Sequence, residues 1–273
     1  MSATRTTTAA AESAKSQPPI APDRGLLRRA VAVLDILAAA EAPPTVRAIA
    51  ERSGLSKSAV QRILVELESV DLAVQDPATR RYRLGPRTLV LGTAYQLRLS
   101  VRDAAMGPMT LLSAEVSETV GLSVGYADRL LHIEQIEPDQ SLRARFHVGR
   151  PLPLWSGAPA RVLLAARSDE EITRVLEVHE HTDIEPVNPP SPDELRRQVE
   201  QVRRSGHARA FEETLLGVHT LSVPARGAHG ELAAVLSITA PSRRLPPERM
   251  DELLPRLLGA AADIAAHLGY RGP

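Results

Sequence analysis

Cysteine is absent from the 273 residues, lysine occurs twice, and aromatic side chains make up 3% of the chain. Without cysteine there are no disulfides, no cysteine zinc sites and no thiol nucleophiles. No apolar run approaches the roughly 20 residues that a membrane-spanning helix needs. The N-terminus also lacks the apolar core of a signal peptide. We therefore expect a cytoplasmic protein with no membrane partner.

The two lysines are Lys15 and Lys57, which excludes Schiff-base catalysis from the C-terminal half. No phosphate-binding GxxxxGK[ST] loop and no His-Glu-x-x-His motif occurs, and we expect no serine nucleophile of the Gly-x-Ser-x-Gly type. His179 and His181 would point away from each other on a helix, which favours a surface pair over a metal site. We therefore expect no catalytic residue, no metal and no cofactor, and predict that the protein is not an enzyme.

Residues 1–22 are rich in Ser, Thr, Ala and Pro with almost no large apolar side chain, so we expect a disordered tail. From Leu26, apolar residues at spacings of three and four predict an amphipathic helix that a Pro-Pro pair stops. Thr45 suits the N-cap of a second helix that closes at Gly54, and Ser56 suits the N-cap of a third. Two short helices joined by a glycine turn form a candidate helix-turn-helix.

The third predicted helix has an apolar face and a polar face. Its apolar stripe consists of Val60, Ile63, Leu64 and Leu67. The opposite face of its first two turns carries hydroxyl, amide and cationic side chains, which suit base edges and phosphates when a helix enters the major groove. The predicted DNA contacts are Thr45, Arg47, Ser56, Lys57, Ser58, Gln61, Arg62, Arg80 and Arg81. The alternative is the solvated face of an ordinary three-helix unit.

The next segment, LAVQDPATRRYRLGP, predicts two short strands joined by a turn at Asp76 and Pro77. Its three arginines suit a basic wing beside the recognition helix. Residues 23–87 hold 11 basic against 8 acidic residues, whereas the chain from residue 88 holds 20 against 24. A modestly basic head on an acidic body is the charge distribution of a DNA-binding unit.

Pro86 is predicted to open a linker helix over residues 86–103. One apolar stripe consists of Val90, Ala94, Leu97 and Val101, and a second of Leu91, Tyr95 and Leu99. A helix that is apolar on two sides needs two partners, of which the second is either a symmetry mate or further core of the same chain. Gly107 and Pro108 predict a helix break early in the C-terminal domain, which we expect over residues 104–273, after a DNA-binding domain over residues 23–85.

The C-terminal domain is predicted to be α+β, an antiparallel sheet with flanking helices. The expected strands cover residues 122–127, 130–137, 142–148, 219–225 and 232–240, and the expected helices cover residues 157–166, 169–179, 192–204 and 247–267. Alternation places Ser237 and Thr239 on one face of their strand, and Thr220 and Ser222 on one face of theirs. Such hydroxyls bind either a ligand with oxygen atoms or helix backbone and buried water.

The stretches PPTVRAIAERSGLSKSAVQRILVELESVDLAVQD, RRYRLGPRTLVLG and GHARAFEETLLGVHTLSVPARGAHGELAAVLSITAP resemble the IclR family of bacterial transcription regulators, over about residues 25–270. The resemblance implies an N-terminal winged helix-turn-helix, a linker helix and a GAF-like effector-binding domain. It also implies dimers or tetramers on palindromic operators. The effector site that it implies comprises Leu152, Ala158, Pro159, Thr220, Ser237 and Thr239.

This sequence departs from the family at that site. Ala160 and Arg161 stand where many relatives have Gly and Lys, and Ala210 stands where relatives that bind small oxoacids have an acidic residue. Pro159 also lacks a backbone N–H. The pocket should therefore be less polar, and we expect an aromatic acid with one polar end, near Trp155, rather than a short oxoacid.

Together these features predict a DNA-binding transcription regulator whose affinity for operator DNA is modulated by a small organic metabolite. Its expected partners are double-stranded operator DNA, the effector and further copies of itself. A GAF-like small-molecule enzyme, and a ligand-independent DNA-binding protein with an inert dimerisation domain, are the alternatives.

Overall fold

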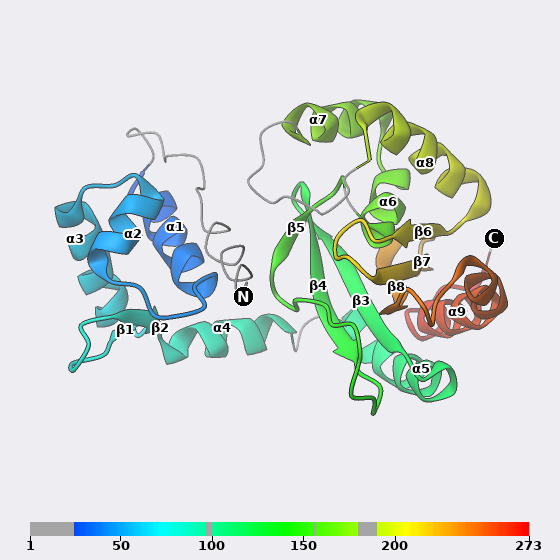
Figure 1. Cartoon of the computed structure of the whole chain (residues 1–273), viewed down its shortest axis with the longest axis horizontal. Coiled ribbons are helices and arrows are strands. Elements are labelled where there is room, and N and C mark those ends of the chain that lie inside the picture. The colour runs from blue at the N-terminus through cyan, green and yellow to red at the C-terminus, as the bar shows by residue number, and fades with distance from the viewer. Residues whose placement is uncertain (1–24, 97–99, 156, 180–189, 273) are drawn as a thin grey trace, which may run out of the picture. The chain divides into compact units, whose positions relative to one another are not determined.

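The computed structural model describes residues 25–96, 100–155, 157–179 and 190–272 (Figure 1). The predicted disordered tail, residues 1–22, lies outside these residues. Contacts divide the chain into two units between Tyr95 and Gln96, and each unit is described by itself.

The first unit contains three helices, α1 (Leu26–Ala38), α2 (Val46–Ser53) and α3 (Lys57–Ser69). They are followed by a hairpin of β1 (Ala73–Gln75) and β2 (Tyr82–Leu84) and by α4 (Pro86–Gln96). The core between the helices and the hairpin consists of Val33, Ile36, Leu37, Ile49, Ala50, Val60, Ile63, Leu64, Leu67, Ala73 and Tyr82. The predicted apolar stripe of the third helix is therefore buried, and the predicted winged helix-turn-helix is confirmed.

Local chemistry fixes the ends of these helices. The Thr45 hydroxyl accepts the Ala48 N–H at 3.3 Å, and the Ser56 hydroxyl accepts the Ala59 N–H at 3.2 Å. Gly54 closes α2 with φ of 68°, a left-handed conformation that favours glycine. The two caps and the glycine turn predicted from the sequence are present.

The second unit is built on an antiparallel sheet of six strands in the order β5-β4-β3-β8-β7-β6. The strands are β3 (Thr119–Tyr126), β4 (Arg129–Ile136), β5 (Pro151–Pro153), β6 (Ala208–Phe211), β7 (Val218–Arg226) and β8 (Leu232–Pro241). The α+β class and four of the predicted strands are confirmed. The strand predicted over residues 142–148 is wrong, and the short edge strands β5 and β6 were not foreseen.

Helices cover both faces of this sheet (Figure 1). On one face, α5 (Ser100–Val116) and α9 (Pro247–His267) pack on side chains such as Val120, Leu122, Leu221 and Leu236. On the other, α6 (Ala158–Ala165), α7 (Asp169–His179) and α8 (Pro192–Ser205) form a second core that includes Leu130, Ala208 and Val235. The helices predicted over residues 157–166, 169–179, 192–204 and 247–267 are confirmed.

The helix break predicted at Gly107 and Pro108 is wrong, because Pro108 lies inside α5. A proline at this position leaves the carbonyl four residues earlier, on Ala104, without its helical partner. His267 at the end of α9 lies 3.1 Å from that oxygen through Nδ1. A contact from another helix thus satisfies the group that the proline frees, and α5 continues.

Candidate functional site

The polar face predicted for DNA contact lies on the first two turns of α3. Lys57, Ser58, Gln61 and Arg62 are all exposed. Within the described part of the chain, neither Lys57 nor Arg62 forms an ion pair, so both cations are available to phosphates and base edges. Gln61 Nε2 lies 3.4 Å from the Tyr82 hydroxyl, which ties the helix to the wing.

The other predicted DNA contacts have local roles in this structure. Thr45 and Ser56 cap their helices, and Arg47 pairs with Glu51 at 2.8 Å on the exposed side of α2. Arg81 donates from Nη1 to the Pro43 carbonyl at 2.9 Å. The structure therefore shows intrachain partners for these residues, and their contact with DNA stays a prediction.

The wing tip is held in a tight turn. The Asp76 carboxylate accepts the N–H groups of Ala78 and Thr79, and these hydrogen bonds lower the pKa of Asp76. Arg80 follows with a backbone φ of 58°, which is uncommon for residues other than glycine or asparagine. The turn places the exposed Arg80 at the tip of the wing.

In the second unit, the predicted effector residues Thr220, Ser237 and Thr239 lie on the sheet face covered by α6, and Ala158 and Pro159 begin that helix. Thr220 on β7 pairs in register with Thr239 on β8, and the two hydroxyl oxygens lie 3.0 Å apart. Thr119 on β3 stands opposite Thr239, and its hydroxyl donates to the Ala144 carbonyl at 2.6 Å. One row of three buried threonines therefore crosses the sheet.

A second polar row lies beside the threonines. Ser222 and Ser237 are cross-strand partners whose hydroxyl oxygens lie 2.7 Å apart, and both are fully buried. Gly121 stands opposite Ser237 on β3, and Gln135 stands opposite Gly121 on β4. The sequence pattern identified the hydroxyls on β7 and β8 but missed their continuation across β3 and β4. The alternation of Thr119, Gly121 and Ser123 was the signal for it.

The continuation includes a buried Ser–His pair. Ser123 Oγ lies 2.7 Å from His132 Nδ1, and burial together with the charge of His147 lowers the pKa of His132 to about 4. Residues 121–125 read Gly-Leu-Ser-Val-Gly, so the spacing that we did not expect does occur. Ser123 lies inside β3 and is fully buried, whereas a nucleophile elbow exposes its serine at a strand-to-helix turn.

Leu152 and the start of α6 lie on the same side of the sheet. Leu152 pairs with Leu130 and packs against the core beneath α6, in which Ala158 is fully buried. Ala208 and Ala210 on β6 stand opposite Ser222 and Thr220. At the edge strand β6, the two rows of hydroxyl side chains therefore end in small apolar side chains.

The start of α6 already carries a carboxylate. Glu213 Oε2 accepts the Gly157 N–H at 3.1 Å and pairs with Arg161 Nη1 at 2.6 Å. Arg161 is 1% exposed, and its Nη2 donates to the Arg209 carbonyl. The N-terminus of α6 is thus occupied by the side chain of Glu213.

No group of three metal-binding side chains occurs among the residues that the structure describes. None of the described helices is both long and apolar enough to cross a membrane.

Comparison with known proteins relates both units to one family. Residues 26–77 match the IclR helix-turn-helix domain, and residues 93–266 match the C-terminal domain of the bacterial transcriptional regulator IclR. The HTH-type transcriptional regulator KdgR of Escherichia coli is 30% identical over 222 residues, 81% of this chain and 84% of KdgR.

Solved structures give the same result. An IclR transcriptional regulator from Alicyclobacillus acidocaldarius is 27% identical with a TM-score of 0.76, covering 89% of this chain and 98% of that one. An IclR homolog from Microbacterium hydrocarbonoxydans, complexed with 4-hydroxybenzoate, is 24% identical with a TM-score of 0.73, covering 89% and 99%.

These matches agree with the winged helix-turn-helix of the first unit and with the α+β fold of the second. The family consists of transcription regulators and not of enzymes. The chain belongs to the IclR family, as a DNA-binding transcription regulator with a C-terminal effector-binding domain.

Proposed function

We propose that the effector is a small aromatic carboxylic acid, and that its binding changes the affinity of the N-terminal unit for operator DNA. The observation that carries the proposal is the polar sheet face, where buried hydroxyls from three adjacent strands meet under α6. Buried hydroxyls rarely gather in such number without a partner. In this structure those of β7 and β8 bond to one another in pairs, and a ligand oxygen would replace one member of a pair.

The charges around the face favour an acid with a large apolar part. Arg161 is balanced by Glu213, so this buried cation is not free to bind a compact dianion or oxoacid. Ala210 and Ala208 provide apolar surface at one end of the rows, and Leu152 and Trp155 provide it at another. A flat apolar body with one polar end suits this distribution, and the 4-hydroxybenzoate bound by the Microbacterium homolog belongs to the same chemical class.

For the N-terminal unit we propose the contacts predicted above, with Lys57 and Arg62 reading bases and Arg80 and Arg81 holding phosphates. Reading a palindromic operator requires two copies. On α4, Leu89, Val90 and Leu91 are 74%, 65% and 54% exposed. Such an apolar surface suits the seam of a homodimer, or of a tetramer built from two dimers. The proposed units remain residues 23–85, 86–103 and 104–273.

The test is operator binding by the full chain, measured by fluorescence anisotropy on duplexes from its own upstream region. We expect benzoate or 4-hydroxybenzoate to change the operator Kd at least tenfold and pyruvate to leave it unchanged. A Kd that none of the acids alters would favour a ligand-independent DNA-binding protein. A response to pyruvate alone would reject an aromatic effector.

A further inference from the structure

We propose that Phe146 is the aromatic wall of the effector site, against which the ring of the ligand stacks, and that Gly121 is the positioning residue that seats it. The inference rests on the proposed function, because it names the residue that selects aromatic acids at that site. Gly121 was placed above by its strand register alone, Phe146 belongs to no site described above, and neither was predicted from the sequence.

The Phe146 ring lies directly on the sheet backbone in the middle of the polar face. A Cβ atom built on Gly121 would lie 2.3 Å from Cε2 and 2.6 Å from Cδ2 of this ring, far inside van der Waals contact. The side chain at this position points to the same face as those of Thr119 and Ser123. Only glycine therefore leaves room for the ring where it now lies.

The ring is also a near neighbour of the proposed ligand oxygens. Gly121 is the register partner of Ser237, and adjacent strands lie about 4.8 Å apart. On its other side the ring meets the buried His132, with centroids 4.4 Å apart and planes tilted by 46°. Phe146 thus stands between the serine pair of β7 and β8 and the Ser123–His132 pair.

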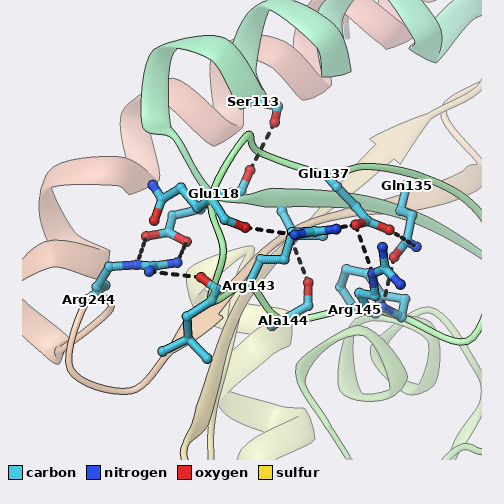
Figure 2. Close-up of polar contacts among 12 residues, drawn as sticks. Ser113, Glu118, Gln135, Glu137, Arg143, Ala144, Arg145 and Arg244 are labelled. Atoms are coloured by element: carbon cyan, nitrogen blue, oxygen red, sulfur yellow. Dashed lines mark hydrogen bonds and ion pairs between the residues drawn. The ribbon is translucent and has the colours of Figure 1, made fainter.

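Backbone and side-chain contacts hold the segment that carries this ring. The Phe146 N–H donates to Gln135 Oε1 at 2.8 Å, and the Thr119 hydroxyl bonds to the Ala144 carbonyl two residues earlier. Figure 2 shows Arg143 and Arg145, on either side of Ala144, both turned toward Glu137. These ion pairs are further contacts between the segment and the residue that follows β4.

The surrounding residues do not cover the Phe146 ring completely. Phe146 is only partly buried, unlike Ser237 and His132, so part of its surface remains open to a second ring. Two aromatic rings in stacking contact gain about 0.5–1.5 kcal/mol beyond the free energy of burying their apolar surface. An aliphatic ring against the same aromatic ring gains only the free energy of burial. Phe146 should therefore discriminate between acids that differ only in aromaticity.

Benzoate and cyclohexanecarboxylate provide this comparison, because they share a carboxylate and have similar size. Calorimetry on the full-length chain should show benzoate binding about 2- to 10-fold more tightly. Phe146→Leu should remove the preference and Phe146→Tyr should keep it. Gly121→Ala should also remove it by displacing the ring, and adding Phe146→Leu to Gly121→Ala should change the ratio no further. Leu142→Ala, 67% exposed in the same segment, is the control and should behave as wild type.

The outcomes separate the two proposals. If wild type binds benzoate and Phe146→Leu keeps the same preference, the inference is overturned and the proposed function stands. If wild type binds neither acid, the proposed function is overturned, and the inference with it. Circular dichroism and operator binding without acid should match wild type for every variant, which excludes misfolding as the cause of a lost preference.

Discussion

Arg161 Nη1 lies 2.6 Å from Glu213 Oε2 in a buried ion pair between residues 52 positions apart. The side chains are only 2% and 12% exposed. Removing one partner of such a pair leaves an uncompensated charge in a poorly solvated place, and this costs more than the intact pair contributes.

Glu213→Gln should therefore lower the free energy of unfolding of the C-terminal unit by about 3–5 kcal/mol. The double change Arg161→Met with Glu213→Leu, which removes both charges, should recover most of that loss. Urea unfolding followed by the fluorescence of Trp155, the one tryptophan of the chain, measures this unit. Glu252→Gln, which breaks an exposed pair with Arg249, is the control and should cost less than about 1 kcal/mol. A double variant as unstable as Glu213→Gln would contradict the argument from charge.

Burial of His132 predicts a pH dependence of stability. Its pKa falls from about 6.5 in an unfolded chain to about 4 in the fold. The unfolded chain takes up this proton first as pH falls, so stability decreases from pH 6.5 to pH 4 and this contribution is constant below. The loss amounts to about 3 kcal/mol. The difference in unfolding free energy between wild type and His132→Gln isolates the effect, and a pH-independent difference would contradict it.

How much of this arrangement the sequence predicts depends on the range of the interactions. The helix-turn-helix follows from local signals, the caps at Thr45 and Ser56 and the turn at Gly54, and it was predicted with nearly correct bounds. Hydroxyl alternation within β7 and β8 likewise predicted that Thr220 and Ser222 share one face of their strand and that Ser237 and Thr239 share one face of theirs, and the register pairs them. Which side chains lie next to each other on the sheet depends on the register between strands. That register cannot be derived from the sequence of any one strand.

The wrong predictions have one cause, contacts between residues that are far apart in the sequence. Residues 142–148 alternate as a strand does, yet Arg143 and Arg145 both turn to Glu137 and the segment leaves the sheet (Figure 2). Pro108 marks a helix break unless another helix supplies a contact for the carbonyl it frees, as His267 does. The contact of Phe146 with Gly121 joins residues 25 positions apart, and composition alone gives no sign of it.

On DNA, Lys57→Ala and Arg62→Ala should each weaken specific operator binding by about 1–3 kcal/mol. Both cations are exposed at the start of α3, where a recognition helix meets base edges. Arg80→Ala and Arg81→Ala should weaken binding to every duplex similarly and lower the salt slope by about one. Fluorescence anisotropy on operator and scrambled duplexes distinguishes the two groups. If Arg62→Ala lost the same binding free energy on both duplexes, Arg62 would not be a residue that reads bases.

Assembly provides a separate prediction. If α4 forms the dimer seam, Val90→Asp places a charge in an apolar contact, and the chain should become monomeric and lose cooperative operator binding. Sedimentation velocity gives the mass. Val65→Asp, on an exposed position of α3 that is 52% exposed, is the control and should leave the mass unchanged. A folded Val90→Asp protein with wild-type mass would place the seam elsewhere.

The serine pair of the polar sheet face predicts opposite effects for its two members. Ser237 and Ser222 share one hydrogen bond at 2.7 Å, so a carboxylate that binds Ser237 must break it. Ser237→Ala removes a charge-assisted bond and should weaken benzoate binding roughly 10- to 100-fold. Ser222→Ala frees the Ser237 hydroxyl and should bind benzoate at least as tightly as wild type. Calorimetry measures both variants, with the exposed Thr173→Ala as control, and a loss at Ser222→Ala equal to that at Ser237→Ala would show that the pair only holds β7 to β8.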